Sequence, residues 1–262
     1  VGNFHIPLTL EGYRAIYRTF DRVVLLSERY VPAYARLAGL AEHPRLAAIG
    51  NPLSFDAPAT REDISGKKRE VLIVARFDEK QKKLSRALAI WREIERREEC
   101  RDWKLVIVGF GPWGDRYRKR AAELRLNNVS FEEGPRDPLP YYRRASIFMM
   151  TSAYEGFPMA LLESQQQGVV PVAFDTFASL HDIVEDGVNG LVIPPGDLGA
   201  YARCLMGLMA HRDVRDEMAW NGVRSCQRYA ADTIAKQWVD LFEAVLSEGR
   251  PVSPRNGPPA AR

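Results

Sequence analysis

The feature that most constrains this chain is an alternation of short apolar runs with amphipathic segments from Val71 onward. The runs are almost continuously hydrophobic, which is typical of strands covered on both faces. Between the first two runs, Leu84, Leu88 and Trp91 recur at helical spacing and predict a buried helical stripe. The alternation predicts an α/β fold with a doubly wound parallel sheet. We expect strands at 71–75, 105–108, 129–131, 147–150, 169–174 and 191–193, and further helices at 115–126, 139–144 and 158–167.

Residues 1–56 follow a different pattern. A strand at 23–26, a helix at 29–37 and a strand at 46–49 are too little to enclose a core of their own. Residues 57–68 carry Pro58, Gly66 and many charges, and we interpret them as a linker. A large domain at 69–230, which includes helices at 198–210 and 214–228, is followed by a C-terminal helix at 231–248. Residues 249–262 hold four prolines and two glycines and are predicted to form a disordered tail.

Composition argues against several functions. The 37 basic and 34 acidic residues leave a formal charge of +3, and no basic stripe with interleaved aromatic residues occurs. We therefore do not expect nucleic acid as the main partner. The three cysteines stand singly, the four histidines fit no metal-ligand spacing, and no Asp-x-Asp motif is present, so we expect no metal site. No apolar stretch approaches about 18 residues, so we expect no membrane-spanning helix.

The most informative segment is 151–163, TSAYEGFPMALLE. A strand ends at its start, a turn with Glu155 and Gly156 follows, and Pro158 occupies a position favoured at the beginning of a helix. The N-terminus of such a helix suits a phosphate, and Glu155 would lie at the carboxyl edge of the sheet, where open α/β folds bind ligands. Glu163, further along the helix, would reach a second group of the same ligand. The spacing alone is equally compatible with two surface glutamates beside an ordinary crossover.

A second candidate site lies in the segment 75–83, ARFDEKQKK. Arg76 ends the first strand of the domain and Lys82 begins the next helical region, so both would point toward the same crevice. Arginine and lysine are the usual ligands of a diphosphate. The alternative is a solvated charged loop, and we favour that interpretation for Lys80 and Lys83.

The segment 109–114, GFGPWG, matches the G-x-G-x-x-G pattern of dinucleotide-binding oxidoreductases, and Glu132 stands near the expected acidic position. Two features argue against that function. Pro112 removes a backbone donor behind the second glycine, and the motif follows the second strand of the domain instead of the first. At the next strand end, Gly134, Pro135 and Arg136 could either pair with a nucleobase or form a plain turn.

Taken in order and spacing, these segments resemble glycosyltransferase family 4, the retaining enzymes of the two-domain GT-B fold, from about Val23 to Leu246. The resemblance rests on the segments VVLLS at 23–27, IGNP at 49–52, ARF at 75–77 with Lys82, VGFGP at 108–112, NVSFEEG at 128–134, YYRRA at 141–145, TSAYEGFPMALLE at 151–163, VPVAFD at 170–175 and EDGVNG at 185–190. It implies a Rossmann-like nucleotide-sugar-binding domain preceded by the end of a second, acceptor-binding Rossmann-like domain. Ala75 and Lys83 stand where the family usually has glycine, which crowds the phosphate loop.

The resemblance also implies roles for individual residues. Arg76 and Lys82 are similar to the pair that grips the donor diphosphate, and Glu155 to the residue that contacts the transferred sugar. Glu163 is similar to the ribose-binding glutamate. The remaining donor contacts implied by the family come from the backbone of Gly156, Phe157, Pro158 and Met159 and from a base platform at Pro135 and Arg136.

We therefore expect a retaining, metal-independent glycosyltransferase that passes a hexose-type sugar from a nucleotide diphosphate sugar to a glycan or lipid-linked acceptor. We expect UDP-sugars to be preferred over GDP-sugars, and a role in cell-surface polysaccharide or lipopolysaccharide synthesis in the cytoplasm, at or near the inner face of the membrane. A non-catalytic nucleotide- or partner-binding module and a nucleotide-sugar epimerase remain alternatives. The chain begins at Val1, so we expect a fragment that binds the donor but transfers no sugar without its acceptor domain.

Overall fold

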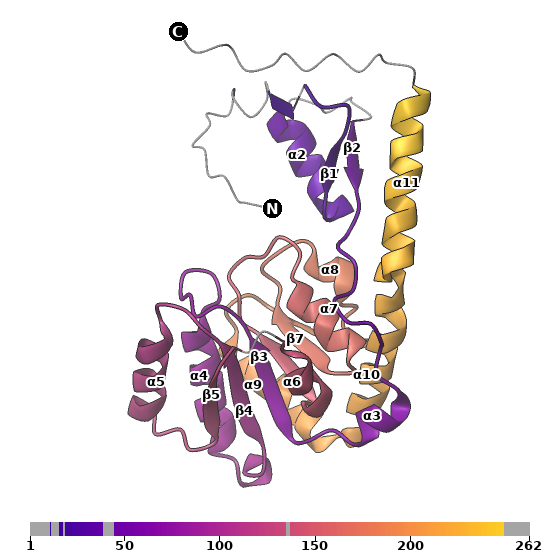
Figure 1. Cartoon of the computed structure of the whole chain (residues 1–262). Helices are drawn as coiled ribbons and strands as arrows, with labels where there is room; N and C mark the ends of the chain where they lie inside the picture. Colours follow the sequence, from indigo (N-terminus) through magenta and orange to yellow (C-terminus); the bar gives the residue numbers. More distant parts are fainter. Residues whose placement is uncertain (1–10, 12–15, 18, 39–44, 135–136, 249–262) are drawn as a thin grey trace.

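The computed structural model describes residues 11, 16–17, 19–38, 45–134 and 137–248. The expectations for Pro135, Arg136 and the tail at 249–262 therefore fall outside the described residues. The main feature is a six-stranded sheet in the order β5-β4-β3-β6-β7-β8, and every neighbouring pair is parallel (Figure 1). The predicted doubly wound parallel sheet is confirmed. Its strands are β3 (Glu70–Val74), β4 (Lys104–Gly109), β5 (Val129–Glu133), β6 (Ile147–Met150), β7 (Val170–Phe174) and β8 (Leu191–Ile193).

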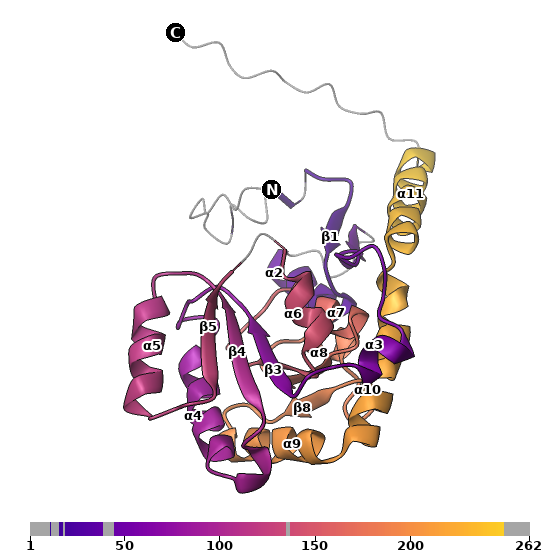
Figure 2. The same cartoon turned by 60° about the horizontal axis from the view of Figure 1, so that its bottom comes forward.

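Helices cover both faces of this sheet (Figure 2). On β3, Val71 and Ile73 belong to one hydrophobic cluster while Leu72 belongs to the other, as the alternation of side chains along a strand requires. On the face of Val71 and Ile73, the sheet packs against α4 (Leu84–Glu95), α5 (Gly114–Glu123), α9 (Leu198–Ala210) and most of the buried side chains of α10 (Arg212–Cys226); this is the first cluster. On the face of Leu72, it packs against α6 (Leu139–Arg144), α7 (Met159–Gln166) and α8 (Leu180–Ile183); this is the second cluster. Burial on both sides explains why the strand sequences are almost continuously apolar.

The strand order places a switch point between β3 and β6. The chain runs outward from β3 through β4 to β5, and then crosses back to lay β6 on the other side of β3. At such a point the connections that leave the two central strands diverge, which opens a crevice at the carboxyl ends of the strands. The loop after β3 begins at Ala75 and Arg76, and the loop after β6 begins at Thr151. The two segments singled out in the sequence therefore lie side by side at this edge of the sheet, where the N–H of Ala153 donates to the carbonyl oxygen of Gln81 at 2.7 Å.

The N-terminal unit is a strand–helix–strand, as predicted. It consists of β1 (Val23–Leu25), the 3-10 turn η1 (Glu28–Tyr30), α2 (Val31–Ala38) and β2 (Leu46–Ala48), with β1 and β2 paired in parallel. The C-terminal helix α11 (Ala231–Ser247) follows α10 and the 3-10 turn η3 (Gln227–Tyr229) and extends to the level of β1 and β2 (Figure 1). Arg22, just before β1, forms an ion pair with Glu248, just after α11, which joins the N-terminal unit to the end of this helix.

The segment between the two units contains a helix that the sequence analysis did not predict. Thr60 and Asp63 form a capping box at the start of α3 (Arg61–Ser65), which satisfies the first N–H groups of the helix. Ile64 is 4% exposed and lies in the first hydrophobic cluster. The side-chain amides of Gln166 and Gln167 donate to the carbonyl oxygens of Phe55 and Ala57 at 2.6 and 2.8 Å. The segment from Phe55 to Ile64 thus packs against the part of the chain that carries the six-stranded sheet.

One smaller difference concerns the start of α7, and two concern short helices. Pro158 is the N-cap of α7 and not its first helical residue, because its ψ of 103° is extended. The short helices α8 and η2 (Glu98–Cys100) were not predicted, since both are too brief to show periodicity. Among the described residues, no helix is both long and apolar enough to cross a membrane.

Candidate functional site

The switch point of the sheet brings three predicted site residues together. Lys82, beside the start of α4, forms an ion pair with Glu155 in the loop after β6, with 2.6 Å between Nζ and Oε1. The two side chains are 17% and 8% exposed, so the pair is largely shielded from water. Arg76 is exposed and reaches this pair indirectly. Its Nη2 donates to Oε1 of Gln81 at 3.1 Å, and Nε2 of Gln81 donates to Oε2 of Glu155 at 3.0 Å.

The loop that carries Arg76 and Lys82 is held by its own acidic residue and by the neighbouring loop. The carboxylate of Asp78 accepts from the backbone N–H of Lys80 at 2.7 Å, and its carbonyl oxygen accepts from the N–H of Lys82 at 2.8 Å. From the loop after β6, the hydroxyl of Thr151 donates to the carbonyl oxygen of Lys82 at 3.0 Å. These contacts hold the backbone of the loop at Lys82 in place, which lowers the entropic cost of binding a ligand there.

Lys83 has a left-handed backbone, with φ 52° and ψ 42°, at the N-cap of α4. This conformation costs a residue with a Cβ roughly 1–2 kcal/mol, whereas glycine adopts it freely. The resemblance noted above has glycine at this position, and the structure supplies the physical reason. The side chain of Lys80 is exposed, in agreement with its interpretation as a solvated lysine.

The two glycines of the G-x-G pattern serve the packing of this loop. A Cβ on Gly109 would lie 1.8 Å from the carbonyl oxygen of Ala75, and one on Gly111 would lie 2.7 Å from that of Phe77. Their φ values of 155° and 149° also fall in a region that disfavours side chains. The glycines let the loop after β4 approach the loop after β3, a structural role that needs no dinucleotide. Beside them lies a cavity of about 480 Å³, lined by residues that include Phe77, Phe110, Arg118, Glu133 and Gly134.

The turn at Glu155 and Gly156 leads into α7. A Cβ on Gly156 would meet no atom within 4 Å, so the absence of a side chain leaves open space there. Phe157 is 7% exposed, and its ring contacts that of Tyr229 with 5.6 Å between the centroids. The turn faces a cleft of about 400 Å³ shared with the N-terminal unit, lined by Val24, Leu25, Leu26, Tyr30, Tyr34, Glu155 and Gly156. Pro158 and Met159 follow at the start of α7.

Glu163 occupies a separate part of the site. It is the fifth residue of α7, and both of its carboxylate oxygens accept hydrogen bonds. The hydroxyl of Ser54 donates to Oε1 at 2.8 Å and that of Tyr142 to Oε2 at 2.9 Å. Burial and the adjacent charge of Glu163 hold the pKa of Tyr142 well above its usual value, so the hydroxyl keeps its proton and remains a donor. The carboxylate is therefore oriented by two donors from other segments.

Several residues that shape the site could not be recognised in the sequence. Gln81 connects Arg76 with Glu155, yet in the sequence it is one polar residue within a charged loop. Tyr30, from the N-terminal unit, donates its hydroxyl proton to the carbonyl oxygen of Glu155 at 3.0 Å. Its position in a helical segment carries no signal for such a contact. Among the residues that the structure describes, no group of His, Cys, Asp or Glu side chains is arranged to hold a metal ion.

Comparison with known proteins defines the class of this site. The sequence profile of the family described as "Glycosyl transferases group 1" matches residues 57–224, which is more than half of the chain. The chain therefore belongs to this family, and the resemblance found in the sequence is confirmed. It is 30% identical over 229 residues to an exopolysaccharide phosphotransferase of Streptomyces coelicolor. It is 28% identical over 199 residues to the amylovoran biosynthesis glycosyltransferase AmsD of Erwinia amylovora.

The matched regions are 87% and 74% of this chain but only 24% and 55% of those two proteins, so the chain spans about half of their length or less. Among solved structures, it is similar to HepE of Anabaena in complex with UDP-glucose, with a TM-score of 0.76 and 19% identity. That match covers 91% of this chain and 69% of HepE. At this level of identity the likeness establishes the fold.

Proposed function

We propose that this chain is the donor-binding part of a retaining, metal-independent glycosyltransferase that uses a nucleotide diphosphate sugar, with UDP preferred over GDP. The observation that carries the proposal is the cluster of Arg76, Gln81, Lys82 and Glu155 at the switch point of the sheet. Two cations and a carboxylate lie there within one hydrogen-bonded chain, at the edge where open α/β sheets bind ligands. Family membership supports glycosyl transfer as the reaction class.

In this proposal the cations receive the diphosphate. Lys82 uses one ammonium proton on Glu155 and has two others to donate, while the guanidinium of Arg76 is exposed and presents several donors. Both would stabilise the negative charge that develops as the nucleotide diphosphate leaves. The negative charge of the diphosphate would then be balanced by Arg76, Lys82 and the N-terminus of α7, which reduces the need for a divalent cation.

The carboxylates would bind hydroxyl groups of the donor. Glu155 and Gly156 border the open space at this turn, and we assign them, together with the backbone of residues 157–159, to the transferred sugar. We assign Glu163 to the ribose, where the hydroxyl groups of Ser54 and Tyr142 would keep the carboxylate oriented. We assign Pro135 and Arg136, which follow Gly134 in the sequence, to the base. The acceptor would be a glycan or lipid-linked sugar in polysaccharide or lipopolysaccharide synthesis on the cytoplasmic side.

Titration calorimetry with UDP and UMP tests the assignment of the cations. A hydrogen bond between charged groups contributes about 1.5–3 kcal/mol, so Arg76→Ala is expected to weaken UDP binding roughly 10- to 150-fold. UMP should lose much less, because Arg76 is placed at the distal phosphate. Lys80→Ala is the matched control on the same loop, and it should change neither affinity. Equal weakening of UDP and UMP, or a larger effect of Lys80→Ala, would place the diphosphate elsewhere.

The two glutamates are separated by a second titration, with UDP and UDP-glucose. Glu163→Ala is expected to weaken both ligands by similar factors, because the ribose is common to them. Glu155→Ala is expected to weaken UDP-glucose more than UDP. If both variants reduce both affinities equally, the assigned roles are wrong.

A further inference from the structure

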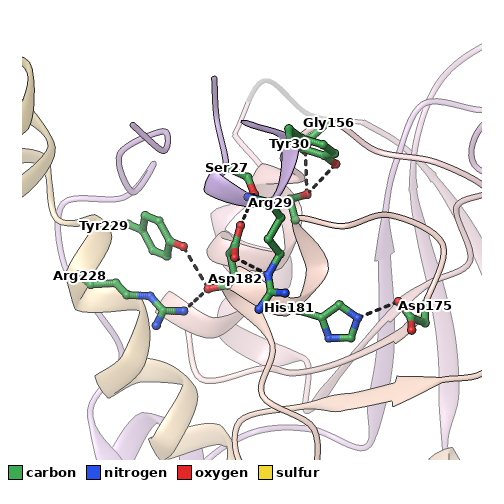
Figure 3. A network of polar contacts seen from close by, with 10 residues as sticks. Ser27, Arg29, Tyr30, Gly156, Asp175, His181, Asp182, Arg228 and Tyr229 are labelled. Atoms are coloured by element: carbon green, nitrogen blue, oxygen red, sulfur yellow. Dashed lines mark hydrogen bonds and ion pairs between the residues drawn. The ribbon is translucent and has the colours of Figure 1, made fainter. Parts of the chain in front are cut away.

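Two hydroxyl groups from outside the donor-binding loops hold the backbone of the turn at Glu155 and Gly156. The Tyr30 hydroxyl, in η1 of the N-terminal unit, donates to the carbonyl oxygen of Glu155 at 3.0 Å. The Ser179 hydroxyl, just before α8, donates to the carbonyl oxygen of Gly156 at 2.7 Å. The two hydroxyl oxygens also lie 3.3 Å apart. Two consecutive carbonyl groups are thus fixed by side chains from elements far apart in the sequence, and Figure 3 shows Tyr30 beside Gly156.

The two hydroxyl groups supply as many protons as the two carbonyl oxygens accept. Each hydroxyl has one proton to donate, and each of the two carbonyl oxygens receives one. Because Ser179 is fully buried and Tyr30 half-buried, a carbonyl oxygen that lost its donor would be only partly compensated by water. The two side chains therefore act together on one turn.

Tyr30 is itself held in place by contacts between the N-terminal unit and α8. The carboxylate of Asp182 accepts from the hydroxyl of Ser27 and from Nε of Arg29, the latter at 2.7 Å. The carbonyl oxygen of Asp182 accepts from the hydroxyl of Tyr229 at 3.1 Å. These contacts, visible in Figure 3, fix the turn η1 and with it the direction of the Tyr30 side chain.

Glu155 is consequently held at both ends. Lys82 and Gln81 orient its carboxylate from the side of β3 and α4, while Tyr30 holds its carbonyl group from the N-terminal unit. We propose that Tyr30 and Ser179 are positioning residues that set the Glu155–Gly156 turn for the transferred sugar. The inference rests on the proposed function, since it assigns the sugar to Glu155. It adds that the N-terminal unit takes part in forming the donor site through one hydroxyl group.

The first test needs no ligand. Hydrogen–deuterium exchange of the amides at 156–157 is measured in the chain and in Tyr30→Phe, which removes the hydroxyl and keeps the ring. Tyr34→Phe is the matched control, because Tyr34 lines the same cleft and its hydroxyl donates to no described residue. We expect faster exchange in Tyr30→Phe and unchanged exchange in Tyr34→Phe. Equal exchange in both variants would overturn the inference.

The second test measures the affinities for UDP and UDP-glucose in Tyr30→Phe and Ser179→Ala. A lost neutral hydrogen bond corresponds to roughly a 3- to 10-fold change, and we expect this loss for UDP-glucose with little change for UDP. A merely structural role would weaken both ligands alike, and that result would overturn the positioning role. Failure of the unchanged chain to bind UDP would instead refute the proposed function. The exchange experiment would still decide whether Tyr30 holds the turn.

Discussion

Replacing Lys82 by methionine tests how much the central ion pair contributes to stability. The substitution keeps most of the side-chain length but removes the ammonium group that lies 2.6 Å from Glu155. The Glu155 carboxylate, 8% exposed, would then keep the amide of Gln81 as its remaining side-chain donor among the described residues. Breaking a fully buried pair costs about 3–5 kcal/mol, and an exposed pair contributes about 0–1 kcal/mol. For the intermediate burial seen here, we expect Lys82→Met to lower the free energy of unfolding by about 1.5–3 kcal/mol.

Thermal and urea unfolding measure this loss. At about 2–4 °C per kcal/mol for a chain of this size, the midpoint should fall by roughly 3–12 °C. Lys80→Met is the matched control, because its exposed side chain lies on the same loop, and it should change stability by less than about 0.5 kcal/mol. In the double variant Lys82→Met/Glu155→Gln the unpaired charge is gone, so part of the loss should be recovered. A midpoint for Lys82→Met equal to that of Lys80→Met, or no recovery in the double variant, would refute this reasoning.

Three further predictions follow from other parts of the structure. Gly109→Ala should lower the free energy of unfolding by about 3 kcal/mol or more, because its Cβ would lie 1.8 Å from the carbonyl oxygen of Ala75. The control Gly207→Ala, in α9 with open space around it, should raise that free energy by about 0.5–1 kcal/mol in the same urea titration. Burial lowers the pKa of Lys67 from 10.5 to about 7, so the unfolded chain binds more protons between these values and stability should rise with pH across this window. Lys67→Met should flatten that rise, and an identical pH profile for the variant would contradict the assignment. EDTA should leave the calorimetric affinity for UDP unchanged, whereas loss of binding that Mg²⁺ restores would contradict a metal-independent site.

Local sequence information was sufficient for most of the fold. Strands buried on both faces need continuous apolar runs, and helices beside them need a stripe at 3.6-residue spacing, so both leave a readable pattern. The positions of Arg76 and Glu155 could be predicted for a related reason. All strands of a parallel sheet end at the same edge, so residues that follow strand ends share one side of the molecule. The helix α3 escaped detection because Ile64 is its single buried residue and five helical residues show no periodicity.

The order of the strands could not be predicted from such patterns, and it decides the site. Only because β6 pairs with β3 do Lys82 and Glu155 come within 2.6 Å of each other. The hydroxyl groups that donate to Glu163 come from Ser54 and Tyr142, and those that donate to the Glu155–Gly156 turn come from Tyr30 and Ser179. These donors are up to 125 residues away from their acceptors in the sequence. The sequence by itself thus determined the helices and strands, and the edge of the sheet at which the candidate binding residues lie. Tertiary packing alone decided which side chains meet there, because such contacts depend on strand order and domain docking, and no local pattern encodes either.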